Sequence, residues 1–236
     1  TVWKDGLRYA DEEEKQRCRE LWHEAFPDDS VSFADYYYGE KVKDNRILVK
    51  AEEGKLVSMA QLNPYSFVCR GREWPVDYIV GVATAGDSRH RGHMRSILKK
   101  MLEDMNRAHV PFTFLMPAAE AIYYPYDFRF VYDQKQIEFD EAFFSARKEY
   151  KNDEHRNVSQ EQIVDRDARF MDAGKMAAFV EENFSDCWNV VALRNAQYYQ
   201  TQILEQQSEF GGMRLVFEEE KLVCIYAYAK EEGLEI

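Results

Sequence analysis

The sequence predicts an α/β fold of α+β character, in which helices pack against a mixed, twisted β-sheet. Short apolar segments typical of strands alternate with segments whose apolar residues recur at helical spacing, which gives the expected order β-α-α-β-β-β-α-β-α-β. The 236 residues are 45% hydrophobic and 14% aromatic, enough to bury a sizeable core. The length corresponds to one large or two small domains.

The first elements are a strand and two helices. Residues 7–10 have the pattern of a short strand. Asp11 is placed to cap a helix that reaches Phe26, and the acidic first turn of this helix suits its dipole. Pro27 then ends it, because proline cannot continue a helix. A second helix is expected over residues 30–42.

Three strands are expected next. Residues 46–51 and 55–63 are strand-like segments joined by Glu52-Glu53-Gly54, which is typical of a β-hairpin. A turn at Arg70-Gly71-Arg72 leads to the third strand, over residues 76–84.

The clearest helix of the sequence follows Gly92. Its apolar residues share one helical face, and they are Met94, Ile97, Leu98, Met101, Leu102 and Met105. Beyond it we expect a strand over residues 111–116, a short helical segment near 119–124 and a strand over 129–139.

The second half of the chain resembles the beginning repeated. Helical stretches over residues 167–183 and 195–207 precede a hairpin at Arg214 that is similar to the one at Arg46. We interpret this as an internal duplication, although any acidic hairpin has a similar pattern. The expected domains are residues 1–144, a polar linker over 145–157, and an incomplete second unit over 158–236.

Composition excludes several classes of protein. The net charge is −12, from 31 basic and 43 acidic residues, which repels phosphate backbones and suits a cationic substrate. No apolar run approaches the ~20 residues of a membrane span, and no secretory signal is visible, so we expect a cytoplasmic protein. The cysteines lie far apart without metal-binding spacing, and we expect reduced thiols and no metal site.

A cluster of cations lies where the strand over residues 76–84 meets the helix after Gly92. Residues 88–100 contain five Lys or Arg residues and no carboxylate. The first N–H groups of a helix lack partners, and its dipole adds roughly half a positive charge there. These features indicate an anion site for a pyrophosphate, with a solvated basic helix face as the alternative. P-loop and dinucleotide motifs are absent from the sequence.

Two motifs resemble the GNAT superfamily of N-acetyltransferases. Arg89-His-Arg-Gly92-His-Met94 after a strand is similar to its Arg/Gln-x-x-Gly-x-Gly/Ala signature, and residues 122–128 are similar to its Tyr-x-x-x-Gly-Phe segment. Met94 and Asp127 depart from the pattern. The first departure resembles the tandem branch of enhanced intracellular survival (Eis-like) acetyltransferases. The resemblance covers residues 5–140, and the remainder only through the repeat.

The resemblance implies an acetyl-CoA-dependent N-acetyltransferase that acts on a primary amine of a cationic small molecule or a lysine. Val82, Ala83 and Thr84 would offer main-chain groups to the pantetheine arm of acetyl-CoA. Tyr123 would be the general acid that protonates the departing thiolate. The residues that would surround the pyrophosphate, mainly through backbone N–H groups, are Arg89, His90, Arg91, Gly92, His93, Met94 and Arg95.

The sequence does not assign the general base to one residue. Strand alternation places Asp77 on the face opposite Tyr78, where relatives often carry a glutamate. Val80 and Val82 are expected on the face of Tyr78. Glu120, an ordered water and a terminal carboxylate are the other candidates.

The repeat predicts a single active site. The second copy ends before its own loop arginine and acid tyrosine, so the chain is either truncated or carries a scaffold that shapes the acceptor side of the first domain. Two alternatives remain: a catalytically silent acyl-CoA-binding module, and a tandem-type aminoacyl or acyl transferase, against which the net charge argues. Exposed edge strands allow a homo-oligomer.

Overall fold

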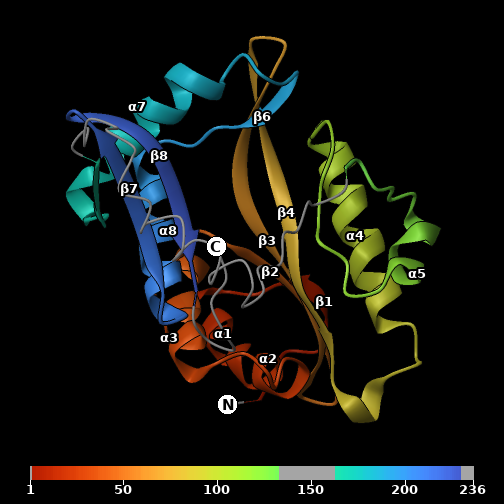
Figure 1. Cartoon of the computed structure of the whole chain (residues 1–236). Coiled ribbons are helices and arrows are strands. Elements are labelled where there is room, and N and C mark those ends of the chain that lie inside the picture. Colours follow the sequence, from red (N-terminus) through yellow and green to blue (C-terminus); the bar gives the residue numbers. More distant parts are fainter. Residues whose placement is uncertain (1, 133–162, 230–236) are drawn as a thin grey trace, which may run out of the picture.

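The computed structural model describes residues 2–132 and 163–229 of the chain (Figure 1). The elements of the first of these parts follow the predicted order as far as the helix after Gly92. They are β1 (Gly6–Tyr9), α1 (Glu12–Arg17), α2 (Arg19–Ala25), α3 (Val31–Gly39), the 3-10 helix η1 (Lys41–Lys43), β2 (Arg46–Glu52), β3 (Lys55–Cys69), β4 (Arg72–Thr84), η2 (Gly86–Ser88), α4 (His93–Arg107), α5 (Glu120–Tyr123) and η3 (Tyr124–Tyr126).

Three predicted elements differ from the structure. The first predicted helix is divided into two, α1 and α2, because the helix is interrupted at Cys18. The strand expected over residues 111–116 is a single parallel bridge between Tyr78 and Phe114. Residues 129–132 form no strand, and the rest of the strand expected there lies outside the described residues.

The second part of the chain repeats the order strand, helices, hairpin. Its elements are β5 (Ile163–Asp167), η4 (Phe170–Asp172), α7 (Ala173–Phe184), β6 (Val190–Ala192), α8 (Ala196–Ser208), β7 (Gly212–Glu218) and β8 (Lys221–Tyr228). The predicted linker lies outside the described residues. Every helix within the described ranges is too short or too polar to cross a bilayer.

The strands form two antiparallel sheets. In the first sheet, β1, β2, β3 and β4 are neighbours in that order; in the second, the order is β5-β7-β8. β5 pairs with β7 as β1 pairs with β2, so the pairing of the first unit recurs in the second. β6 leaves the second unit and pairs with the distal end of β3, where Val191 lies opposite Val68. The predicted α/β class is confirmed, with antiparallel sheets.

Helices cover both faces of the first sheet (Figure 1). The helices α1 to α3 bury Trp22, Tyr37 and Tyr38 against one face. The predicted apolar face of α4 covers the other, where Ile97 and Leu98 are fully buried. Each such side chain contributes roughly 1.5–3 kcal/mol through burial. The sheet therefore separates two cores, and β4 has one face toward each.

A β-bulge at Gly81 changes the direction of the side chains that follow it in β4. The register between β3 and β4 shifts between Met59 and Gln61, and Gly81 has a φ of +58°. A Cβ atom at Gly81 would lie 2.6 Å from a ring carbon of Trp22, so glycine is required there. Past the bulge, Val82 packs into the core of α4, while Val80 packs against α1 to α3. The expectation that both valines share one face was therefore wrong.

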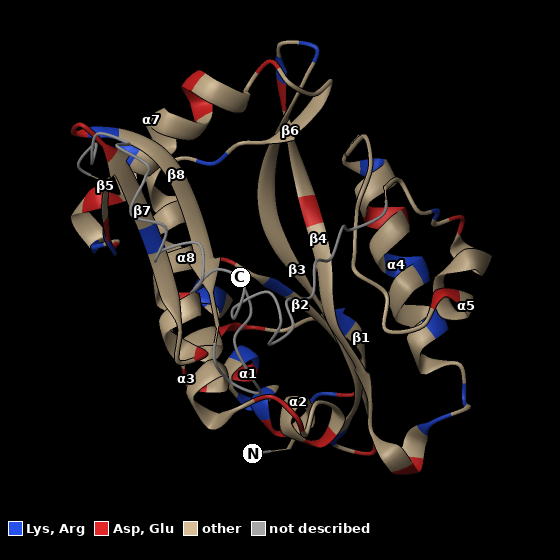
Figure 2. Cartoon of the chain, viewed as in Figure 1, with Lys and Arg blue, Asp and Glu red and all other residues tan. Residues whose placement is uncertain are grey.

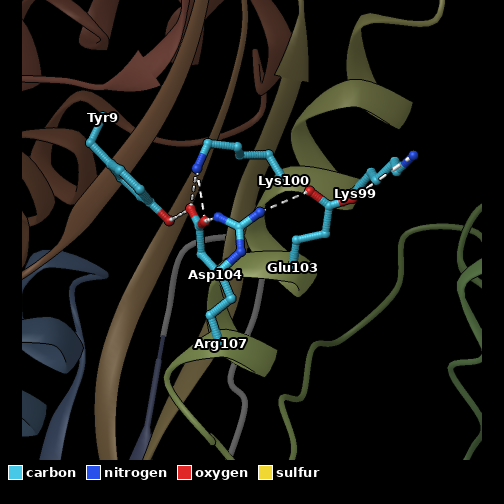
Figure 3. Close-up of polar contacts among 6 residues, drawn as sticks. All are labelled: Tyr9, Lys99, Lys100, Glu103, Asp104 and Arg107. Atoms are coloured by element: carbon cyan, nitrogen blue, oxygen red, sulfur yellow. Dashed lines mark hydrogen bonds and ion pairs between the residues drawn. The ribbon is translucent and has the colours of Figure 1, made fainter.

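A polar network fastens the carboxyl-terminal half of α4 to β1 (Figure 3). The Asp104 carboxylate accepts a hydrogen bond from the Tyr9 hydroxyl at 3.1 Å and pairs with the Lys100 ammonium at 2.6 Å. Glu103 and Asp104 both pair with Arg107, at 3.7 and 3.3 Å. The members of the network are Tyr9, Lys99, Lys100, Glu103, Asp104 and Arg107.

Candidate active site

The loop before α4 leaves backbone N–H groups without partners inside the helix. Gly92 is the N-cap residue, with a φ of +79° and no side-chain cap. The first helical hydrogen bond of this turn runs from the Ser96 N–H to the Gly92 carbonyl, at 3.1 Å. The N–H groups of the three residues between them therefore have no carbonyl within the helix to bond. His90 also has a positive φ, of 63°, which shapes the turn.

The arginines of this loop form no ion pairs with carboxylates of the described residues. Arg89, Arg91 and Arg95 are exposed, and none of them forms an ion pair with a described residue. Figure 2 shows the basic positions along α4. The Arg89 Nε lies 3.4 Å from the Thr84 carbonyl oxygen, which directs its side chain toward the end of β4. The helix dipole, the open N–H groups and three unpaired guanidinium groups favour an anion at this position.

Of the predicted site residues, His93 has a buried side chain and Met94 a partly buried one. The ring of His93 is 4% exposed, and neither of its nitrogens has a hydrogen-bond partner among the described residues. Its Nδ1 lies 3.8 Å from a carboxylate oxygen of Glu52. Met94 packs against the core beneath α4, so an apolar side chain is favourable there. Both residues can therefore contribute to an anion site through their N–H groups rather than through their side chains.

Next to this loop, the second edge of β4 has few partners among the described residues. Among the described residues, its partner on that side is the bridge between Tyr78 and Phe114, where the Ile79 N–H donates to the Phe114 carbonyl at 3.0 Å. Beyond the bridge, no described strand pairs with this edge. Of the predicted residues, Ala83 has its carbonyl engaged by the Ser58 hydroxyl at 2.7 Å. An extended ligand can therefore lie along the rest of this edge.

Tyr123 is the last residue of α5 and lies on the same side of the sheet as α4. Its ring is buried in the core of α4 and packs edge-on against Phe128, with centroids 5.8 Å apart. Burial raises the pKa of Tyr123, and the neighbouring Tyr78 adds to the effect. The phenol is therefore protonated at neutral pH, as a general acid must be. A small pocket beside it is also lined by Leu115 and Glu120.

Asp77 and Tyr78 differ in their availability for chemistry. The Asp77 carboxylate is buried and paired with the Arg46 guanidinium at 2.6 Å. The Tyr78 ring instead packs against Phe114, at a centroid distance of 5.0 Å. Burial raises the pKa of Tyr78, while a hydrogen bond from the Met116 N–H acts in the opposite direction. Asp77 is thus committed to an ion pair.

Sequence reasoning missed two features of this region. Gly81 forms the bulge in β4, and a glycine within an apolar strand is the signal that could have identified it. The second is a group at the junction of the two units, around Tyr65, Lys41 and Glu205. Glu205 lies 140 residues beyond Tyr65, and no local pattern places it there.

A comparison with known protein families identifies the family that the first unit matches. The sequence model of a family described as acetyltransferase (GNAT) domain matches residues 6–131. This range holds both the loop before α4 and Tyr123. None of the curated proteins matches the sequence significantly.

Solved structures with a similar fold include a conserved Enterococcus faecalis protein of unknown function, described as a probable N-acyltransferase. The likeness has a TM-score of 0.67 at 14% identity and covers 96% of this chain and 55% of that one. The chain thus spans about half the length of that protein, and the likeness shows the fold alone. A predicted acetyltransferase from Clostridium acetobutylicum, solved with acetyl-CoA, gives a TM-score of 0.49 at 14% identity, over 56% of this chain and 95% of that one.

Proposed function

The chain belongs to the GNAT acetyltransferase family, and on that premise we propose that it transfers the acetyl group of acetyl-CoA to a primary amine. Acetyl-CoA is the acetyl donor of this family. The acceptor would be a cationic small molecule or a lysine side chain. The observation that carries the proposal is the start of α4, where open N–H groups and unpaired arginines lie beside the free edge of β4.

The donor would be held by two kinds of contact. The pyrophosphate of acetyl-CoA is an anion, and the N–H groups of His93, Met94 and Arg95 form a concave set of donors for it. Arg89 and Arg91 would add charge-assisted hydrogen bonds from the loop. The pantetheine arm would follow the open edge of β4 near residues 82–84. Apolar side chains on the α4 side of the bulge support this path.

Tyr123 would protonate the leaving group. An unprotonated amine attacks the thioester carbonyl, the carbon–sulfur bond breaks, and the thiolate of CoA takes the phenol proton. The nitrogen must lose a proton to a base. The ion pair between Asp77 and Arg46 disfavours that carboxylate as the base. Glu120, a water or a terminal carboxylate would take this role.

We further infer that residues 158–236 belong to a second unit of the same kind, as in the tandem branch of the family. The repeated pairing of a first strand with a hairpin supports this inference. The second unit would then serve as a scaffold on the acceptor side, and the chain would hold one active site, in residues 1–144. Contact between α3 and α8 joins the units at that side.

The test is acetyl-CoA turnover, followed by thiol release, with polyamines, aminoglycosides and lysine peptides as acceptors. We expect Tyr123→Phe to lower kcat about 100-fold, because the thiolate then leaves without general acid catalysis. Calorimetry should show unchanged acetyl-CoA binding in this variant. A wild-type chain that binds acetyl-CoA and acetylates no acceptor would instead be an acyl-CoA-binding module. A chain that binds no acetyl-CoA would contradict the donor site itself.

A further inference from the structure

Charged and aromatic side chains gather at the junction of the two units, away from the loop before α4. The Tyr36 hydroxyl of α3 donates a hydrogen bond to the Glu205 carboxylate of α8, at 2.9 Å. Tyr65 of β3 packs edge-on against Tyr78 of β4, with ring centroids 6.2 Å apart. The Arg194 guanidinium, just before α8, lies 5.8 Å from the centre of the Tyr198 ring. Both units therefore supply polar side chains to this region.

Lys41 is the unusual member of the group. Its ammonium nitrogen lies 5.1 Å from the centre of the Tyr65 ring, within the range of a cation–π contact. No described carboxylate lies within 4 Å of it, although Glu40 and Lys43 on the same turn pair with each other at 2.6 Å. The side chain is half-buried. A partly desolvated ammonium without an anion is costly, unless a ligand supplies one.

Electrostatics show that charges of both signs meet at this point. Burial lowers the pKa of Lys41, and the carboxylates of Glu205 and Asp44 oppose that shift. Burial raises the pKa of Tyr65; Glu205 adds to this shift and Arg194 reduces it. The junction thus places Lys41, which forms no ion pair with a described residue, near the Glu205 carboxylate, which accepts a hydrogen bond from the Tyr36 hydroxyl.

We propose that Lys41 binds the carboxylate of an amino-acid acceptor, and that Glu205 faces the ammonium group of the same molecule. A zwitterion matches both signs of charge, whereas a bare anion would be repelled by Glu205 and a bare polyamine by Lys41 and Arg194. Tyr65 connects this subsite to Tyr78 of β4, the strand along which the pantetheine arm is proposed to lie. The inference rests on the proposed function, and it narrows the acceptor from amines in general to amines that carry a carboxylate.

Calorimetric binding without acetyl-CoA tests the subsite directly, with two matched pairs of probes: L-lysine with cadaverine, and L-alanine with ethylamine. Each pair differs by the carboxylate. For at least one pair, we expect the amino acid to bind the wild-type chain about tenfold more tightly than the amine, as a charge-assisted hydrogen bond implies. Lys41→Met should remove this preference. Lys43→Met, on the same turn, should retain it, because Lys43 is exposed and paired with Glu40.

Three results would overturn the inference. In the first, each amine binds the wild-type chain as tightly as its matched amino acid. In the second, the preference for the amino acid survives Lys41→Met. In the third, the wild-type chain binds none of the four probes. Circular dichroism of Lys41→Met would verify that its fold is intact, and Lys41→Arg should keep the preference because it keeps the charge. A preference for amino acids in a chain that transfers no acetyl group would contradict the proposed function and leave the subsite supported.

Discussion

The two ends of α4 carry basic residues in opposite circumstances. At the carboxyl-terminal half, Lys99, Lys100 and Arg107 pair with acidic residues one turn away, and the network reaches Tyr9 of β1 (Figure 3). At the start of the helix, Arg91 and Arg95 have no described carboxylate partner. Basic residues of one helix thus serve two purposes. Paired cations stabilise the fold, and unpaired ones beside open N–H groups mark a ligand site.

The largest effect should come from removing the unpaired cations together. In Arg89→Ala/Arg91→Ala/Arg95→Ala, we expect acetyl-CoA affinity to fall about 100-fold, since each guanidinium offers charge-assisted hydrogen bonds to phosphate. The Tm should stay near that of the wild type, because these side chains form no ion pair with described residues. Calorimetric titration and thermal melting would measure both. An unchanged affinity would remove the distinction between the two ends of the helix.

Asp104→Asn should have the next largest effect, and on stability rather than on binding. It removes the charge that Lys100 and Arg107 share, and we expect a loss of about 1–2 kcal/mol in the free energy of unfolding. Acetyl-CoA affinity should change less than twofold. Urea denaturation measures the first quantity. A large loss of affinity at unchanged stability would contradict the assignment of this network to the fold.

The stability that Asp104 contributes should depend on pH. Burial raises the pKa of Asp104, but hydrogen bonds from Lys100 and Tyr9 outweigh it and leave the pKa below its ordinary value. The carboxylate therefore contributes stability above the unfolded pKa of about 4, and this contribution is lost as the pH falls through the lowered folded value. The stability difference between wild type and Asp104→Asn should shrink in that acidic range. A constant difference would exclude the charge as its source.

Tyr9→Phe should have a smaller effect. The change removes one hydrogen bond to Asp104 and leaves the pairing with Lys100 intact, so we expect a loss of about 0.5–1 kcal/mol. The wild-type hydroxyl also has its pKa raised to about 12, chiefly by burial, so it remains a donor throughout the neutral range. Denaturation of Tyr9→Phe and Asp104→Asn, singly and combined, would give their coupling energy. Full additivity would argue against the bond.

The smallest effect is expected for Lys99→Ala. Lys99 is well exposed, and its distance to Glu103 is 3.8 Å, so the ion pair contributes about 0.5 kcal/mol at most. Neither Tm nor acetyl-CoA affinity should change measurably. A clear loss of affinity would extend the anion site one turn further along α4 than the unpaired arginines define.

The sequence predicts those parts of the fold that depend on local patterns. The apolar spacing in α4 predicted the buried face at Ile97 and Leu98, and Asp11 forms the expected cap, with its carboxylate accepting from the Glu14 N–H at 2.9 Å. The break at Cys18 was not predicted, because no glycine or proline marks it. Alternation placed Val82 on the wrong face, since it assumes an unbroken ladder and β4 contains a bulge.

The predicted site residues vary in the same way. Gly92 and the arginines around it follow one another in the chain, so their gathering at the start of α4 could be read from the motif. The junction that contains Lys41 and Glu205 depends on how two units pack. Such long-range contacts leave no periodic pattern in the sequence, and α8 gave no local sign that one of its carboxylates would face the first unit.

The pairing of β6 with β3 has a consequence for the cooperativity of the chain. A strand of the second unit completes the edge of the arm formed by β3 and β4, with Ala192 opposite Phe67. Neither unit can then unfold without exposing backbone hydrogen-bonding groups of the other. We infer that the chain melts in one transition, and that the first unit, separated from its neighbour, would present an aromatic strand edge prone to aggregation.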